Sequence, residues 1–225
     1  MHKLLTLFCL FISSTALAQS SSLVSPEVPA GGTAINIAVS SYDDRAGDDF
    51  FSEADRIEKK GDLFNAMTLF GKAAFEYNSA HQFNNYGSAL LRLSNVHLLL
   101  NNYTEAEQVV LNVALKNYSR IHSAQGQMNS YRQLAKIYLA ANRLTEALWF
   151  STQQGILARQ LNNKSGNIES ILGIANVKIK KKQYTLARKD LIRAEMLAKT
   201  SNNNAYRSEI NQVRSQIPGP VTSKK

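Results

Sequence analysis

The stretch Leu93-Ser-Asn-Val-His-Leu-Leu-Leu-Asn-Asn-Tyr-Thr-Glu-Ala106 decides the fold, because its pattern returns as Leu134-Ala-Lys-Ile-Tyr-Leu-Ala-Ala-Asn-Arg-Leu-Thr-Glu-Ala147. In each stretch a short polar break precedes a bulky residue, and an alanine follows three positions later. Shorter versions stand at Asp62-Leu-Phe-Asn-Ala66 and at Gln183-Tyr-Thr-Leu-Ala187. The spacings between the four alanines are 40, 41 and 40, so the chain contains four copies of one unit.

A second small residue lies twelve positions before each of these alanines. It is Ala54, Ser94, Ala135 and Ala175, again with spacings of 40, 41 and 40. Two antiparallel helices approach closely only where both present small side chains. Each copy is therefore predicted to be a helical hairpin, with the earlier small residue on helix A and the alanine on helix B.

Stacked hairpins explain how such a chain buries a core, because one hairpin cannot cover its own apolar face. The four prolines stand at positions 26, 29, 218 and 220, so none interrupts helix between them. We expect an all-α, right-handed α-α superhelix in a domain at residues 47–217. The predicted hairpins are 48–80, 81–122, 123–162 and 163–202, followed by a capping helix at 205–217 and a disordered tail at 218–225.

The paired small residues resemble those of the tetratricopeptide repeat (TPR) family, over about residues 48–200. Three departures stand out. The repeat of 40–41 residues is longer than the family's usual 34, the helix-ending proline is missing, and Ser151 and Gln154 replace a bulky and a small residue. We expect the extra residues to lengthen the two helices on either side of each connection between hairpins. The resemblance implies a long-period variant that binds protein segments.

The first eighteen residues have the features of a cleaved secretory signal peptide. Lys3 places a positive charge near the N-terminus, and an apolar stretch follows up to Ile12. Ala16-Leu17-Ala18 then forms an A-x-A cleavage signal before Gln19. We expect a flexible arm at residues 19–46 and an exported product, periplasmic or secreted in a bacterium. Cys9 is the only cysteine and lies in the leader, which excludes a disulfide scaffold or a cysteine-based zinc site.

Charge is distributed unevenly along the chain. Residues 19–62 contain nine acidic and four basic residues, a net charge of −5, whereas residues 159–225 contain fourteen basic and four acidic residues, a net charge of +10. The overall charge of +9 therefore belongs to the C-terminal third. The run Lys178-Ile-Lys-Lys-Lys182 either stabilises a helix C-terminus or contacts an anionic envelope surface.

No nucleophile, phosphate-binding or metalloprotease motif is present, so we predict a non-enzymatic protein without cofactor, metal or catalytic residue. The three histidines outside the leader, His81, His97 and His122, lack metal-ligand spacing, and His97 is expected to pack in the core. Trp149 and Met196 are also expected there. Glu58 and Glu169 are the candidate acids of an enzyme, but no partner for either is evident.

Polar residues on the concave face of the A helices form the candidate binding groove. Asparagine amides can hold an extended peptide backbone, and arginine and lysine attract carboxylates. An ordinary solvated helix face would carry the same residues, so both interpretations stay open. The predicted peptide-binding residues are Arg92, Asn95, Asn129, Arg132, Gln133, Lys136, Asn176 and Lys180.

These features predict an exported scaffold or adaptor that binds a protein or peptide segment. Acidic segments are among the expected partners. Two alternatives remain: a cell-wall glycan-binding protein or enzyme, and a self-associating envelope assembly factor. We expect no nucleic-acid partner, because the chain is exported. We expect no membrane-spanning segment, because no other apolar stretch is long enough. The sequence leaves the oligomeric state open.

Overall fold

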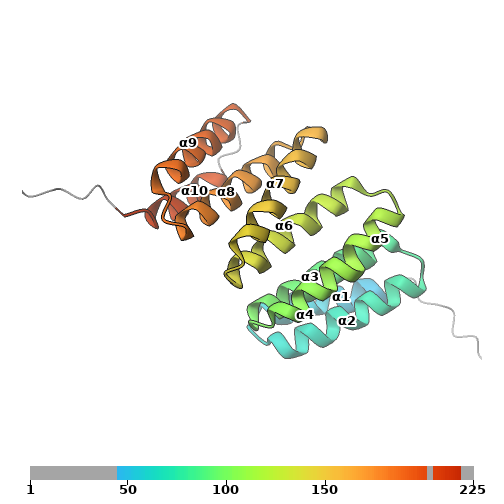
Figure 1. Cartoon of the computed structure of the whole chain (residues 1–225). Helices are drawn as coiled ribbons and strands as arrows, with labels where there is room; N and C mark the ends of the chain where they lie inside the picture. Colours follow the sequence, from blue (N-terminus) through green and yellow to red (C-terminus); the bar gives the residue numbers. More distant parts are fainter. Residues whose placement is uncertain (1–44, 202–204, 219–225) are drawn as a thin grey trace, which may run out of the picture. The chain divides into compact units, whose positions relative to one another are not determined.

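The described part of the chain consists of helices, and three-residue turns join those from α1 (Ala46–Lys59) to α9 (Tyr184–Thr200) (Figure 1). The computed structural model describes residues 45–201 and 205–218, all within one unit, Ser40–Lys225. The predicted signal peptide, nearly all of the predicted arm and all but the first residue of the predicted tail lie outside the described residues. None of the described helices is long and apolar enough to cross a membrane.

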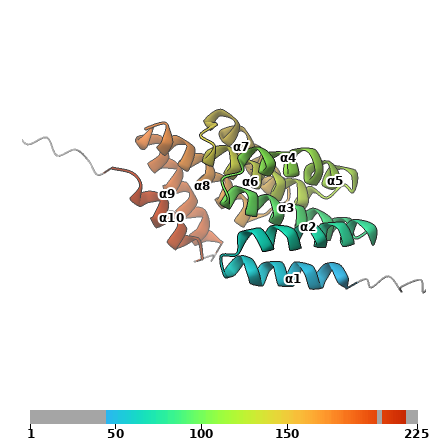
Figure 2. The ribbon, with the colours of Figure 1, turned by 90° about the horizontal axis from the view of Figure 1, so that it is seen from below.

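Four helices A and four helices B alternate along the chain, and the predicted all-α fold is confirmed as a helical repeat solenoid. In Figure 2, α1 and α2 lie side by side as the first hairpin. The helices A are α1 (Ala46–Lys59), α3 (Phe83–Leu99), α6 (Ala124–Ala140) and α8 (Lys164–Lys180). The helices B are α2 (Leu63–Ser79), the segments α4 (Tyr103–Gln108), η1 (Val109–Ala114) and α5 (Leu115–Arg120), then α7 (Leu144–Gln160) and α9 (Tyr184–Thr200), before α10 (Tyr206–Ser215).

Every turn between α1 and α9 has the same backbone conformation. Its middle residue has a positive φ, for example 62° at Asn101 and 60° at Asn142. The next amide then donates back to the last turn of the preceding helix, as Asn102 N does to His97 O at 2.9 Å. His81 and His122 occupy the same middle position, so they are turn residues. All of these turns have three residues, so the turns do not account for the long repeat. The residues by which this repeat exceeds the usual 34 therefore lie in the helices.

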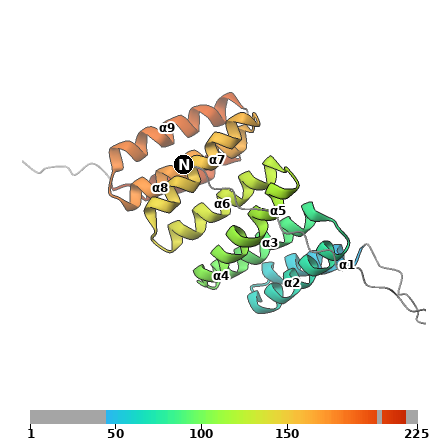
Figure 3. The ribbon, with the colours of Figure 1, turned by 45° about the vertical axis from the view of Figure 1, so that its right-hand side comes forward.

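The paired small residues are buried in every hairpin. Ala54, Ala66, Ala147 and Ala175 are fully buried. Ser94 fits the same position because its hydroxyl donates to the Ala106 carbonyl at 3.0 Å. Neighbouring hairpins also touch through their helices A, since α6 contacts both α3 and α8 (Figure 3). The buried apolar residues form separate clusters, and those around Phe70, Tyr77 and Phe150 each draw residues from neighbouring hairpins.

A π-helical segment, η1, interrupts the second helix B. The α4–η1–α5 helix runs over residues 103–120, one residue longer than the 17-residue helices α2, α7 and α9. A π-turn accommodates one extra residue without breaking the helix. The larger spacing between Ala106 and Ala147 is thus absorbed inside the helix, and the turns keep their length.

The prediction that Trp149 and Met196 belong to the core is wrong, because their side chains are 52% and 57% exposed. Trp149 follows the buried Ala147 by two positions, and Met196 follows the buried Ala187 by nine. Helical periodicity places both positions on the outer face of their helices. The indole of Trp149 contacts the rings of Tyr131 and Phe150 edge-on.

Candidate functional site

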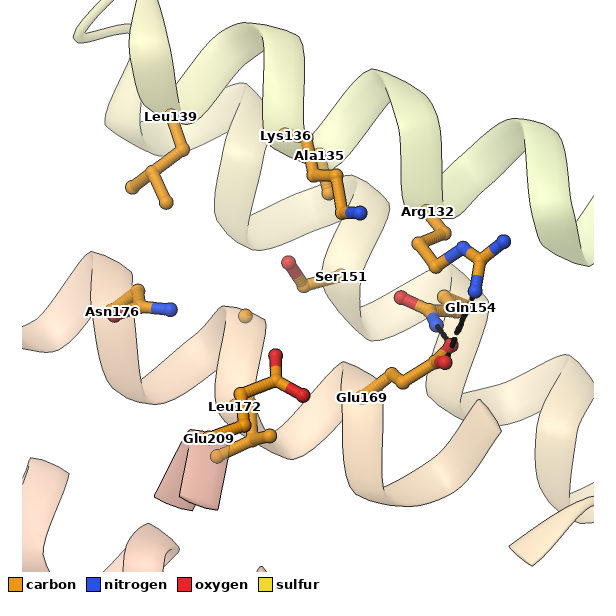
Figure 4. A pocket seen from close by; sticks show the side chains of 11 residues that line it. Arg132, Ala135, Lys136, Leu139, Ser151, Gln154, Glu169, Leu172, Asn176 and Glu209 are labelled. Atoms are coloured by element: carbon orange, nitrogen blue, oxygen red, sulfur yellow. Dashed lines mark hydrogen bonds and ion pairs between the residues drawn. The ribbon is translucent and has the colours of Figure 1, made fainter. Parts of the chain in front are cut away.

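A recess between the third and fourth hairpins collects side chains from four helices (Figure 4). Its cavity has a volume of about 170 Å³. Three of the predicted groove residues, Arg132, Lys136 and Asn176, line it together. The other lining residues are Ala135 and Leu139 of α6, Ser151 and Gln154 of α7, Glu169, Leu172 and Gly173 of α8, and Glu209 of α10.

Glu169 is held by three partners at one end of this recess. The Arg132 Nη1 donates to both of its carboxylate oxygens at 3.0 Å. Gln154 Nε2 donates at 3.3 Å, and the Tyr206 hydroxyl donates at 3.0 Å. The structure thus supplies the partner of Glu169 that was not evident from the sequence, and the positive charge of Arg132 is balanced by this carboxylate of the next repeat.

Glu58 is engaged in the same way at the first two hairpins. It forms an ion pair with Arg92 and accepts from Asn95 Nδ2 at 3.0 Å. Arg92 also pairs with Asp55 at 2.5 Å, and its guanidinium lies over the Phe70 ring. Here too the structure supplies partners that were not evident from the sequence. Arg92 and Asn95 link α1 to α3, away from the recess.

Lys136 differs from the two arginines, because it forms no ion pair with any residue that the structure describes. Its side chain projects into the recess (Figure 4). Desolvation lowers the pKa of this ammonium, and the nearby Arg132 charge lowers it further, whereas Glu169 and Glu209 oppose the shift. The Lys136 side chain as a whole is exposed, so solvent reaches the ammonium while the wall of the recess partly desolvates it.

The remaining predicted residues do not line the recess. Asn129 accepts from Gln125 Nε2 at 3.2 Å. Gln133 is buried, and its Nε2 has no hydrogen-bond partner among the described residues. Lys180 is exposed at the end of α8. The structure thus brings three of the eight predicted residues into one site.

Sequence reasoning missed four polar residues of this region: Ser151, Gln154, Tyr206 and Glu209. The first two were noted only as departures from the repeat pattern, although polar residues at core positions were the available signal. Ser151 and Gln154 are both buried. Tyr206 and Glu209 belong to α10, which contacts α8 and α9, and a polar capping helix alone does not reveal which groove it borders.

No group of three or more potential metal ligands is found within residues 45–201 and 205–218. His97 is half-buried, and desolvation lowers its pKa. Asp48 accepts from the Tyr77 hydroxyl at 2.6 Å and Asp55 pairs with Arg92, so both carboxylates serve contacts within the first two hairpins. Besides the paired Arg132 and Glu169 and the buried Ser151 and Gln154, the recess presents one ammonium, the Asn176 amide and the Glu209 carboxylate.

Comparisons with known proteins agree with the fold. No protein-family model matches the sequence, and no curated protein matches it either. The chain is similar to a solved structure described as the crystal structure of the apo form of RapI, with a TM-score of 0.69 and 11% identity over 79% of this chain. The chain spans 65% of the length of RapI. At this identity the similarity shows a shared TPR-like helical repeat fold and nothing more.

Proposed function

We propose that this protein is an exported, non-enzymatic scaffold that binds a protein or peptide segment on its helices A. The observation that carries the proposal is the recess of about 170 Å³, in which Lys136 has no ion pair among the described residues. Binding of a carboxylate beside this ammonium is favourable, because the added negative charge stabilises the protonated form of Lys136, whose pKa is otherwise lowered. The ligand expected here is a segment carrying an aspartate, a glutamate or a C-terminal carboxylate.

The other groups of the recess restrict which segments fit. Asn176 can donate to and accept from a peptide backbone, and Glu209 favours a donor at the other side of the ligand. A volume of about 170 Å³ is enough for one side chain but not for a folded element. An acidic side chain followed by a hydrogen-bond donor satisfies both groups.

Export and an envelope contact belong to the same proposal. The leader at residues 1–18 supports export to the periplasm, and N-terminal analysis of protein isolated from an envelope fraction tests it by whether the chain begins at Gln19. Lys180, Lys181 and Lys182 are exposed and supply the basic run proposed to meet the envelope, whereas Lys178 is paired with Asp190 at 2.5 Å.

A selection with displayed random peptides tests the groove directly. Peptides retained by the protein should be enriched in aspartate, glutamate or a free C-terminal carboxylate. Lys136→Glu should weaken their binding by at least about tenfold, because losing a charged hydrogen bond costs about 1.5–3 kcal/mol. Lys164→Glu, the same change at an exposed position of α8, serves as the matched control.

Two results would overturn the groove assignment. One is a set of selected peptides without acidic enrichment. The other is equal binding by wild type and Lys136→Glu while circular dichroism shows both chains folded. Either result would leave the helices A as an ordinary solvated face.

A further inference from the structure

The outer face of α9 combines cations with exposed apolar side chains in a single stripe. Lys189, Ile192, Arg193 and Met196 stand at positions i, i+3, i+4 and i+7, which share one face of a helix. Ile192 is 55% and Met196 57% exposed. The buried residues Ala187, Leu191, Ala194 and Ala198 occupy the opposite face, where α9 packs on its neighbours.

The carboxylates near this stripe are already occupied by other cations. Asp190 is paired with Lys178, and Glu195 with Lys199 and Arg214. In contrast, Lys189 and Arg193 form no ion pair with any part of the chain that the structure describes. The exposed Lys180, Lys181 and Lys182 immediately precede α9 and add to the same charge. The surface is therefore strongly and locally positive.

The equivalent helix of the preceding hairpin lacks this combination. On α7 the exposed Trp149 and Ile156 have no lysine or arginine between them in the sequence. Exposed apolar residues recur on the outer faces of α2, α7 and α9. On α2 the single exposed Lys72 lies between Phe64 and Phe75, whereas α9 places both Lys189 and Arg193 beside Ile192 and Met196. The basic character of α9 is thus a property of that helix and not a consequence of the repeat.

We propose that α9 and the turn before it dock the protein on an anionic phospholipid surface. The lysine and arginine side chains meet the phosphates, and Ile192 and Met196 enter the boundary between headgroups and acyl chains. A fluid lipid surface fits this stripe better than a folded acidic partner does. Lipid headgroups can move to meet flexible cations and isolated apolar side chains, whereas the carboxylates of a folded protein have fixed positions that must match those of the cations. The inference deepens the envelope contact proposed above and rests on that part of the proposed function, not on the recess.

Co-sedimentation of the full chain with vesicles tests the inference. Vesicles of phosphatidylglycerol mixed with phosphatidylcholine should bind the protein, and vesicles of phosphatidylcholine alone should bind it weakly. Lys189→Glu/Arg193→Glu should weaken binding by at least about tenfold, since each cation at an anionic surface is worth about fivefold. Ile192→Ser/Met196→Ser should also weaken it, and the weakening should persist at raised salt.

Matched control variants separate this surface from general effects. Lys116→Glu/Lys164→Glu makes the same change in net charge at exposed positions of α5 and α8. Phe64→Ser/Phe75→Ser removes two side chains on α2 that are each 68% exposed. Both controls should bind vesicles like the wild type. Because every protein carries the same N-terminal residues, any binding by the leader is common to all of them.

Three outcomes would overturn the lipid assignment. The protein binds both kinds of vesicle equally, or the α9 variants bind no more weakly than their controls, or soluble polyglutamate binds α9 in a variant-dependent way while vesicles are ignored. The last outcome would assign α9 to an acidic protein. Peptide binding at the recess should be unchanged in the α9 variants, so failure of the two proposals can be told apart.

Discussion

Tyr118 fills a space that two glycines leave open between neighbouring hairpins. Its ring is only 3% exposed. A Cβ atom added at Gly87 of α3 would lie 2.4 Å from the Tyr118 Cζ, and one added at Gly126 of α6 would lie 2.0 Å from its Cδ1. Both distances are far below ordinary van der Waals contact, so the second helix B can pack between two helices A only because neither has a side chain there.

Gly126→Ala should lower the free energy of unfolding by about 1–3 kcal/mol, because the new methyl group overpacks the Tyr118 ring. Gly71→Ala on α2 should have the opposite sign, a gain of roughly 0.5–1 kcal/mol, because alanine is the better helix former. No atom lies within 4 Å of the Cβ added at Gly71. Urea denaturation of the two variants measures both values.

A double variant locates the cause of the Gly126 effect. In a Tyr118→Leu background the cost of Gly126→Ala should shrink, since the smaller side chain leaves room. If the Gly126→Ala protein is as stable as the wild type, packing of the Tyr118 ring does not require glycine at position 126.

At the scale of an element, η1 shows how the solenoid tolerates an insertion. If the first alanine of α2, α7 or α9 is position i, buried side chains follow at i+4, i+7 and i+11. Counted from Ala106 in α4–η1–α5, the buried apolar side chains stand at i+4, i+8 and i+12, which are Val110, Ala114 and Tyr118, and the polar Asn117 is buried beside Tyr118 at i+11. The shift by one position occurs within the π-helical segment, so the apolar face is realigned before the helix ends.

Deletion of Asn112, which is exposed in η1, should convert this helix to a regular α-helix of the same length as α2. The unfolding free energy should stay within about 1 kcal/mol of wild type, because the buried positions return to the spacing of the other helices. Thermal melts followed by circular dichroism measure the change.

Deletion of Thr152 from α7 is the matched control, since this residue is also exposed. It should destabilise strongly, because it rotates the buried Gln154 and Ala158 by about 100° around a helix that has no residue to spare. Equal damage from the two deletions would contradict the realignment assigned to η1.

At the scale of the whole molecule, polar contacts join each hairpin to the next. Arg92 with Glu58 and Arg132 with Glu169 connect helices A. On the helices B, Arg143 of the turn before α7 pairs with Glu107 of α4 at 2.7 Å. The Tyr138 hydroxyl also donates to Glu107 at 2.8 Å, and burial raises its pKa to about 12. Helix α10 closes the C-terminal end with the buried Ile210 and Val213.

Ile210→Ala should destabilise the C-terminal end first, at a cost of about 2–5 kcal/mol for a buried isoleucine. In a repeat array each hairpin is stabilised mainly by its neighbours, so protection should fall in α8 and α9 and persist in α1 and α2. Hydrogen exchange read by mass spectrometry resolves these helices. A uniform loss along the chain would show instead that the array unfolds as one unit.

Much of the fold could be predicted from the sequence because its repeat is made of local signals. Helical spacing, polar breaks and the small residues at Ala54 or Ala147 depend on side-chain size and on the helical period alone. Errors arose where burial depends on a neighbouring helix. The position of Trp149, two residues after the buried Ala147, indicates the outer face of its helix, but only the stacked structure shows that no neighbouring helix covers that face.

The sequence by itself therefore determined the helical hairpins, their number and the small residues at their contacts, since these follow from properties within one repeat. Only the tertiary structure decided which polar residues remain free for a ligand. Arg132 meets Glu169 from 37 positions away, and Lys136 is left unpaired among the described residues. The physical reason is that stacking sets the distances between charges on successive hairpins, and no periodicity within a helix records those distances.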